Sequence, residues 1–298
     1  MICVGVDAGG TATIAAVSED GVYLREARGA SANPSWGGVE PAAGVIAATV
    51  RAVLNGSQPD AVHVGAAGAA RDAIAAELEQ QLARAFPGTH VTVGDDASIA
   101  LRAVLPEGDG AVLVAGTGSV AYAERAGEAR RVGGLGWLAG DEGSAFWIGW
   151  QAVKLYGRVL DGRAQRDETT DLVARALDAP DRDRYLDALY GAPRDPASIA
   201  ALAPSLIAFA GKGNRAATKI VQAAATELAD LVKAVVRGAR LLDASPPVVL
   251  TGGLFRDNSL LSFLVETRIV GDVPGVHLLK GGAEPVRGAL RRAERGAR

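Results

Sequence analysis

The sequence is poor in the residues that build disulfides, zinc sites and membrane spans. Its 298 residues contain one cysteine, Cys3, and three scattered histidines. This excludes a disulfide or an all-cysteine metal site within one chain. No apolar run reaches the ~18 residues of a membrane span, and the first residues lack the basic start and apolar stretch of a signal peptide. We therefore expect a soluble, cytoplasmic protein with no membrane partner.

The chain also lacks an excess of positive charge. Lys and Arg total 31 against 34 Asp and Glu, a net charge of −3, whereas a protein that grips nucleic acid needs a basic field. Aromatic residues make up only 5%, but hydrophobic residues reach 49% and glycine is frequent at 38. This composition indicates a globular protein whose core consists of Ala, Val and Leu between tight backbone turns.

The order of the predicted elements indicates an internal duplication. Alternating apolar residues predict a strand over 2–7, a turn at Ala8-Gly9-Gly10 and a returning strand over 11–17. The same strand, glycine turn and strand recur over 111–124. We expect an α/β protein of two domains, 1–105 and 106–298. In a variant of this division, the last helix, 284–298, packs back on the N-terminal lobe. The expected helices are 40–54, 72–86, 97–105, 215–243 and 284–295, and another is expected to start near residue 141.

The first glycine turn is a candidate phosphate-binding site. Gly9 and Gly10 let backbone amides approach an anion closely, and Thr11 and Thr13 share one face of the following strand. Asp7 ends the strand before the turn, and a carboxylate beside a phosphate implies a cation between them. The sequence therefore predicts Mg²⁺ at Asp7.

The second turn, Gly116-Thr117-Gly118-Ser119, offers the same chemistry. Gly116-x-Gly118-x-x-Ala121 also matches a relaxed dinucleotide-binding pattern, which requires a helix directly after the turn. An oxidoreductase that uses NAD(P) is therefore one alternative. Pairing the two glycine turns explains more of the chain, because the dinucleotide interpretation leaves the first turn without a role.

Three carboxylates and a glycine pair complete the candidate residues. Asp95 and Asp96 lie between a strand and a helix, where one can act as a general base while the other caps the helix. Asp141 lies in a segment, 133–149, with six glycines and two tryptophans, and could receive two hydroxyls of a sugar ring. Gly252-Gly253 follows a predicted strand and could support a purine.

In chain order, five segments resemble the N-acetylglucosamine kinase branch of the actin, hexokinase and heat-shock ATPase superfamily, which also contains the BadF-type activator ATPases. These segments are Asp7-Ala-Gly-Gly-Thr-Ala-Thr13, Asp96-Ala97, Gly116-Thr-Gly-Ser119, Gly140-Asp-Glu-Gly-Ser-Ala145 and Thr251-Gly-Gly253. The resemblance implies two duplicated ribonuclease-H-like (actin/hexokinase-type) α/β domains with a nucleotide cleft between them.

The resemblance also implies an activity and the role of each residue. The activity would be ATP-dependent phosphorylation of N-acetylglucosamine or glucosamine at the 6-hydroxyl, with Asp96 as the base. Asp7 would organise Mg²⁺ through water, and a homodimer is possible. The implied nucleotide-binding residues are Asp7, Gly9, Gly10, Thr11, Thr13, Gly116, Thr117, Gly118, Ser119, Gly252 and Gly253. The implied sugar-binding residues are Asn33, Asp96, Gly134, Asp141 and Ala145.

Two departures from the family and three alternatives remain. Leu135 stands where the family often has tryptophan, with Trp137 two places later in the chain, and Asp95 stands where the family often has Asn or Thr.

The alternatives are an N-acetylmuramic acid kinase, the oxidoreductase above and a non-catalytic sugar or ATP sensor. Sensors of this kind usually add a DNA-binding helix-turn-helix, for which the start of the chain leaves no room. Activator ATPases hold an iron–sulfur cluster through cysteines, and Cys3 alone is too few.

Overall fold

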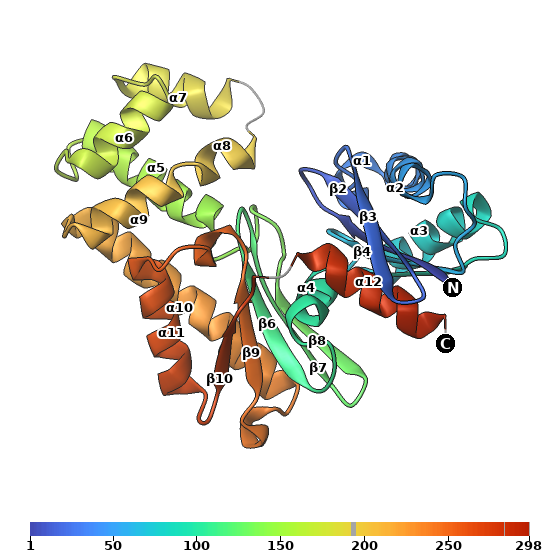
Figure 1. Cartoon of the computed structure of the whole chain (residues 1–298). Helices are drawn as coiled ribbons and strands as arrows, with labels where there is room; N and C mark the ends of the chain where they lie inside the picture. Colours follow the sequence, from blue (N-terminus) through green and yellow to red (C-terminus); the bar gives the residue numbers. More distant parts are fainter. Residues whose placement is uncertain (192–194, 283, 298) are drawn as a thin grey trace. The chain divides into compact units, whose positions relative to one another are not determined.

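The computed structural model describes residues 1–191, 195–282 and 284–297, and the chain forms two compact units (Figure 1). The first unit comprises Met1–Gly108 together with Gly281–Arg298, and the second comprises Asp109–Lys280. Arg298, the last residue of the range assigned to the final helix, lies outside the described residues. Within the described parts of the chain, no helix combines the length and the apolar character needed to cross a membrane.

The first unit is built on a five-stranded mixed sheet in the order β3-β2-β1-β4-β5. β1 pairs antiparallel with β2 and parallel with β4, and β4 pairs parallel with β5. The strands are β1 (Ile2–Ala8), β2 (Thr13–Glu19), β3 (Val22–Gly29), β4 (Ala61–Ala66) and β5 (His90–Asp95). The helices are α1 (Pro34–Gly37), α2 (Val39–Leu54), α3 (Asp72–Ala85), α4 (Asp96–Val104) and α12 (Pro285–Gly296).

Strand alternation divides the core of this unit between the two faces of the sheet. Val4 and Val6 pack in one cluster with Ile46 of α2 and Leu78 of α3. Cys3, one position along β1, packs in a second cluster with residues of α12. Successive side chains of a strand point to opposite faces, so α2 and α3 cover one face and α12 covers the other.

The second unit repeats this topology. Its sheet has the order β10-β9-β6-β7-β8, with β6 antiparallel to β7, β7 antiparallel to β8, and β9 parallel to both β6 and β10. The predicted duplicated α/β fold is thus confirmed, since strand order and polarity match those of the first unit. The strands are β6 (Gly110–Ala115), β7 (Ser119–Arg125), β8 (Glu128–Gly133), β9 (Pro247–Thr251) and β10 (His277–Lys280).

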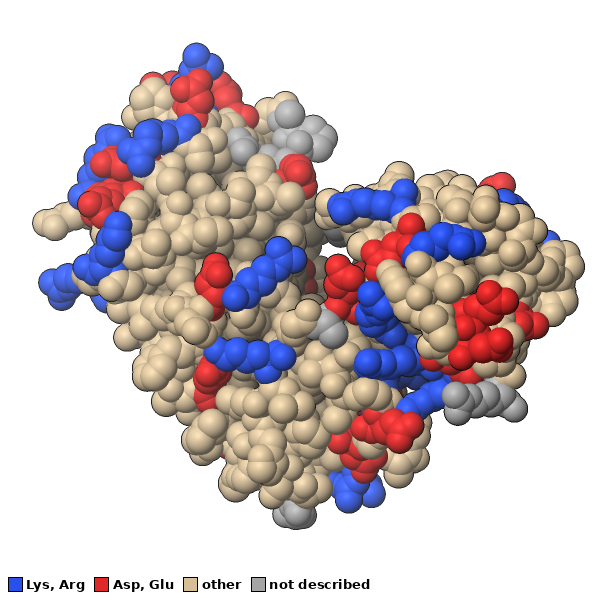
Figure 2. Space-filling model, in the orientation of Figure 1, with Lys and Arg blue, Asp and Glu red and all other residues tan. Residues whose placement is uncertain are grey.

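A series of helices between β8 and β9 distinguishes the second unit from the first. Figure 2 shows that, on the visible face, charged side chains of both signs gather over α6 and α7, while much of the surface beside them is uncharged. The helices are α5 (Ala145–Leu160), α6 (Glu168–Ala176), α7 (Arg182–Tyr190), α8 (Pro196–Ala200), α9 (Ala203–Gly211) and α10 (Arg215–Gly238). Two 3₁₀ turns (Leu242–Ala244 and Gly253–Phe255) and α11 (Leu260–Asp272) follow.

The helix predicted over 215–243 is shorter than expected. α10 ends at Gly238, and the chain passes through Arg240 with φ +58° before the separate 3₁₀ turn at Leu242–Ala244. A left-handed residue cannot continue a right-handed helix. The apolar spacing of Val235 and Leu242 misled the prediction, because it continues across the break.

α12 packs on α4 and β1 within the first unit, and two glycines permit this contact. A Cβ atom at Gly5 would lie 2.1 Å from the backbone nitrogen of Leu290, and one at Gly288 would lie 1.9 Å from the carbonyl oxygen of Ile99. Arg291 donates to the carbonyls of Arg102 and Ala103 at 2.8 Å each and so satisfies the end of α4. The last helix therefore belongs structurally to the first unit.

We expect Gly288→Ala to lower the free energy of unfolding by about 2 kcal/mol or more, because the added methyl forces α12 away from α4. Urea denaturation measures this loss. Gly44→Ala in α2 is the matched control, since its Cβ would enter open space and alanine favours a helix by up to about 1 kcal/mol. Equal stability of the two variants would contradict the close contact.

Candidate functional site

In the first unit, the carboxyl ends of three parallel strands bring the candidate acids to one edge of the sheet. Asp7 on β1 is in register with Gly65 on β4, which is in register with Gly94 on β5. Asp95 follows Gly94 directly. Since adjacent strands lie about 4.8 Å apart, the ends of β1 and β5 are roughly 10 Å apart. Open α/β sheets bind ligands at this edge.

Asp7 is half-buried at the end of β1. Burial raises the pKa of its carboxyl group from 3.8 to about 6, because removal from water penalises the charged form. A cation beside this carboxylate would offset the cost of its charge.

The first glycine turn leaves two amides at its tip without a backbone acceptor. Gly9 closes the turn by donating to the carbonyl of Ala12 at 3.0 Å. Gly10 and Thr11 are exposed, and neither amide donates to an acceptor in the described parts of the chain. Thr13 is fully buried, and its hydroxyl donates to the carbonyl of Ala30 at 2.7 Å. Thr11 thus presents its hydroxyl to solvent, whereas the Thr13 hydroxyl holds the base of the turn.

The second glycine turn is similar, although its closing hydrogen bond spans two residues where that of the first turn spans three. Gly116 donates to the carbonyl of Gly118 at 2.9 Å, and the amides of Thr117 and Gly118 have no acceptor among the described residues. Thr117 is exposed. Ser119 is buried, and its hydroxyl donates to the carbonyl of Glu142 at 2.8 Å. In both units a buried hydroxyl group holds the turn in place, and the amides at the tip of the turn have no acceptor among the described residues.

Asp95 and Asp96 occupy different places at the start of α4. Asp95 is the N-cap, and its carboxylate accepts a hydrogen bond from the amide of Ala97 at 2.8 Å. The predicted capping role of one member of the pair is therefore confirmed for Asp95. Asp96 is the first residue of the helix, with one carboxylate oxygen 3.0 Å from the same amide. Its role as a base remains a prediction.

Asn33 lies beside the first glycine turn. Ala32 donates to the carbonyl of Gly9 at 3.3 Å, which joins the Asn33 loop to the turn. The side-chain oxygen of Asn33 caps α1 by accepting from the amide of Ser35 at 2.9 Å. Its NH₂ group has no partner in the described residues, so it can donate to a ligand.

A loop beside Asn33 was not predicted from the sequence. Gly68, with φ +88°, follows β4, and its carbonyl accepts from the hydroxyl of Ser35 at 3.0 Å. A Cβ at Gly68 would lie 2.5 Å from the side-chain oxygen of Asn33. Gly68 lies two residues after β4, at the edge of the sheet where ligands bind.

The carboxylate of Asp141 packs against the backbone of the second turn. A Cβ at Gly118 would lie 2.7 Å from an Asp141 carboxylate oxygen, so a larger residue there would displace that carboxylate. Burial raises the pKa of Asp141, while hydrogen bonds from the amides of Ser119 and Gly136 oppose the rise. These amides use part of the capacity of the carboxylate, which can accept about four hydrogen bonds.

The expectation of a helix starting near Asp141 is wrong. Asp141 has φ +53°, and α5 begins at Ala145 with Ser144 as its N-cap. The Ser144 side chain accepts from the amide of Trp147 at 3.1 Å. The carboxylate of Asp141 instead accepts from the amides of Ser119 and Gly136, and serine is a favoured N-cap residue, so Ser144 caps α5.

The remaining candidates of the second unit surround the same turn. Gly134 donates to the carbonyl of Ser119 at 2.9 Å, and Ala145 donates to the carbonyl of Gly116 at 2.9 Å. Gly252 has φ +103°, and a Cβ there would lie 2.3 Å from the carbonyl oxygen of Ala115. The amide nitrogen of Gly253 would lie 3.8 Å from a Cβ at Gly116. The unit therefore gathers the second turn, Gly134, Asp141, Ala145 and the Gly252-Gly253 pair.

The loop after Gly134 exposes apolar side chains. Leu135, which replaces the family tryptophan, is 73% exposed. Trp137 is partly exposed and meets the ring of Phe146 edge to face at 5.5 Å. An aromatic surface is therefore present in this loop in spite of the substitution at Leu135.

The dinucleotide-binding interpretation of Gly116–Ala121 is wrong, because the structure does not have the helix that it requires. The turn leads into β7, which pairs antiparallel with β6 from Ala115 opposite Ser119. The pattern requires a helix at this point, with its N-terminus directed at a pyrophosphate. Instead, Ser119–Arg125 forms a strand that is buried from Ser119 to Ala123 and occupies the place of that helix.

Comparison with known proteins gives partial matches to curated relatives. The chain is 27% identical over 202 residues to an N-acetylmuramic acid/N-acetylglucosamine kinase of Clostridium acetobutylicum. The aligned region covers 67% of this chain and 66% of the relative. It is 33% identical over 180 residues to a glucosamine kinase of Vibrio cholerae, which covers 57% of this chain and 59% of that protein. The chain thus spans less than two thirds of the length of these relatives.

Solved structures match over nearly the whole chain. The crystal structure of a candidate N-acetylglucosamine kinase from Chromobacterium violaceum has a TM-score of 0.77 and 26% identity, covering 97% of each chain. A ROK hexokinase from Thermus thermophilus has a TM-score of 0.59 and 20% identity, covering 99% of this chain and 98% of the other, and shares the fold. The model of the BadF/BadG/BcrA/BcrD ATPase family matches residues 4–293. The chain therefore belongs to the BadF/BadG/BcrA/BcrD ATPase family, and its two units have the hexokinase-type fold.

Proposed function

We propose that this protein is an ATP-dependent amino-sugar kinase that phosphorylates N-acetylglucosamine or glucosamine at the 6-hydroxyl. The observation that carries the proposal is the pair of equivalent turns with unpaired amides at their tips. Successive free amides form a concavity that binds anions such as phosphate. The relatives named above act on amino sugars, which supports this class of acceptor. N-acetylmuramic acid is the second candidate acceptor, because the Clostridium relative carries both names.

Each unit supplies phosphate-binding groups. In the first unit these are the amides of Gly10 and Thr11 with the Thr11 hydroxyl, and in the second unit the amides of Thr117 and Gly118 with the Thr117 hydroxyl. The buried hydroxyls of the two turns keep them in shape. Gly252 and Gly253 provide a backbone surface without side chains for the adenosine.

Asp96 acts as the general base. Its carboxylate accepts the proton of the 6-hydroxyl as the sugar oxygen bonds to the γ-phosphorus and the bond from that phosphorus to the β-phosphate oxygen breaks, releasing ADP. Phosphoryl transfer needs mainly alignment and charge neutralisation. The NH₂ group of Asn33 and the carboxylate of Asp141 orient the sugar through its hydroxyl and amino substituents.

The residues around Asp7 fit a magnesium ion held through water. Mg²⁺ is usually bound by one or two carboxylates and substrate phosphates while keeping several waters. Asp7 supplies one half-buried carboxylate two residues before the first turn. When bound, Mg²⁺ neutralises charge on the phosphates.

We expect ADP release with N-acetylglucosamine, glucosamine or N-acetylmuramic acid to exceed that with glucose. A coupled ADP assay across these four sugars measures the preference, and phosphorus NMR identifies the position of the ester. Absence of sugar-dependent ADP release across the panel would refute the proposed function.

We expect Asp96→Asn to reduce turnover by roughly 10²-fold or more, the usual contribution of a general base, with ATP affinity nearly unchanged. Asp95→Asn is the matched control, because asparagine caps a helix as well as aspartate does and the neighbouring carboxylate stays. Single-turnover kinetics and nucleotide titration separate the two effects. A larger loss of turnover in Asp95→Asn would move the base to Asp95.

We expect Asp7→Asn to stabilise the ligand-free protein by about 1–3 kcal/mol at pH 7.5. The folded-state pKa of about 6 exceeds the unfolded value, so stability falls as pH rises through roughly 4 to 6 and stays reduced above it. The gain should therefore shrink toward zero near pH 4. Thermal and urea unfolding at both pH values measure it.

Glu77→Gln, an exposed position on α3, serves as the control for loss of one carboxylate. A stabilisation of Asp7→Asn that does not depend on pH would show that Asp7 does not titrate in this range.

A further inference from the structure

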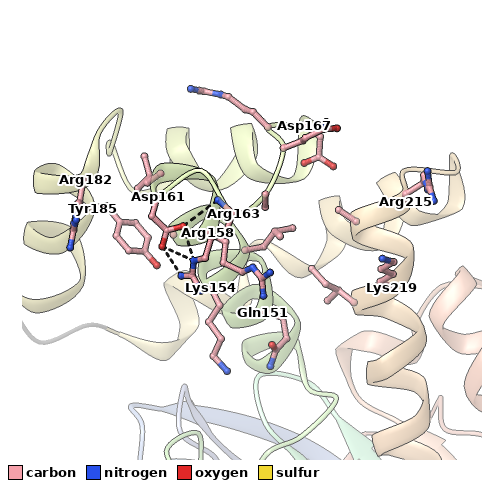
Figure 3. Close-up of a pocket in the computed structure, with 18 of the residues that line it drawn as sticks. Gln151, Lys154, Arg158, Asp161, Arg163, Asp167, Arg182, Tyr185, Arg215 and Lys219 are labelled. Atoms are coloured by element: carbon pink, nitrogen blue, oxygen red, sulfur yellow. Dashed lines mark hydrogen bonds and ion pairs between the residues drawn. The ribbon is translucent and has the colours of Figure 1, made fainter.

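The helices inserted in the second unit enclose a groove that none of the predicted site residues lines. The groove has a volume of about 1320 Å³ and is bordered by α5, the segment 161–167, α7 and the start of α10. Figure 3 shows Lys154 and Arg158 of α5 in the middle of the groove, with Arg182 of α7 on one side and Arg215 and Lys219 of α10 on the other. We call it the α5–α10 groove.

The lining of this groove is strongly basic although the chain as a whole carries a net charge of −3. Seven Lys or Arg side chains border it against two aspartates. Arg163 forms an ion pair with Asp161, and Arg166 pairs with Asp171. The other aspartate, Asp167, caps α6 and accepts from Asn214 at 3.2 Å.

The five remaining cations form no ion pair or hydrogen bond within the described parts of the chain. They are Lys154, Arg158, Arg182, Arg215 and Lys219. Arg158 lies close enough to Asp161 to contribute to the lowered pKa of that carboxyl group, whose main cause is its hydrogen bond with Arg163. Five like charges in one groove repel one another, and an anion bound among them would relieve this repulsion.

The floor of the groove is apolar. Ile220 is buried, and Trp147, Leu155 and Ala216 are half-buried. The Tyr185 hydroxyl donates to the carbonyl of Val153 at 3.0 Å, so it belongs to the wall. A basic rim over an apolar floor suits a ligand with phosphate groups at one end and a ring or chain at the other. An apolar lining with a small number of directed polar groups is typical of small-molecule sites.

The groove is distinct from the second glycine turn. The turn contacts the first residue of α5, Ala145, whereas Arg158 lies near the other end of that helix. At a rise of 1.5 Å per residue the two are roughly 20 Å apart along the helix axis. A phosphate held by the turn therefore cannot reach Arg158.

We propose that the α5–α10 groove is a second binding site that takes a small phosphorylated molecule with at least two negative charges. Arginine favours phosphate because its guanidinium group can donate two parallel hydrogen bonds to it. Arg158 and Lys219 contact the phosphates, and the apolar floor holds the remainder of the ligand. The proposal does not depend on the identity of the sugar acceptor.

Isothermal titration with inorganic pyrophosphate tests the site on the full chain. We expect Arg158→Glu/Lys219→Glu to lose one pyrophosphate site or to weaken it by roughly tenfold or more. Any site at the glycine turns should remain. Lys212→Glu/Arg237→Glu is the matched control, since it reverses one Lys and one Arg of the same unit outside the groove. It should bind as the unaltered protein does.

Arg158→Gln/Lys219→Gln provides a second test if charge reversal impairs folding, which thermal unfolding would reveal. Equal stoichiometry and affinity in the groove variants and the control would overturn the proposal, as would absence of pyrophosphate binding by the unaltered protein. Tighter binding of a single-stranded oligonucleotide than of pyrophosphate, lost in the groove variants, would overturn the assignment to a small molecule.

Discussion

The tight closure of two equivalent turns is the constraint on which the proposed chemistry depends. In each turn the first glycine donates to a carbonyl two or three residues further along the chain, that of Ala12 or of Gly118, and the amides at the tip have no acceptor among the described residues. The buried hydroxyls of Thr13 and Ser119 hold the turns from inside. Because a free amide at the surface must find water or a ligand, the amides at the tips of both turns are available to an acceptor from outside the chain.

The placement of Asp96 depends on packing far from it in the sequence. α4 starts at Asp96 and ends against Arg291 of α12. It lies close to the sheet because Gly65 has no Cβ, which would overlap Ile99. The last helix thus fixes the axis of α4. A carboxylate at the first position of a well-held helix has little freedom, which favours precise contact with a hydroxyl.

The two units differ most where the helices are inserted between β8 and β9. This insertion adds the α5–α10 groove while leaving the sheet and the glycine turn of the second unit comparable to those of the first. α5 joins the two features, since its first two residues donate to carbonyls of the turn and residues from Trp147 to Leu160 border the groove. A ligand in the groove would therefore contact the same helix that supports the second glycine turn.

The amino-acid sequence by itself determined the strands, the duplication and the positions of the turns. Alternating apolar residues such as Val4 and Val6, and glycine pairs at strand ends, are local signals that survive in any tertiary context. Tertiary structure alone decided which hydroxyls face solvent, that Asp141 adopts a left-handed conformation beneath Gly118, and that α12 joins the first unit. These outcomes arise from contacts between residues distant in the chain, and hydrophobic spacing carries no record of the hydrogen bonds and close approaches that select among them.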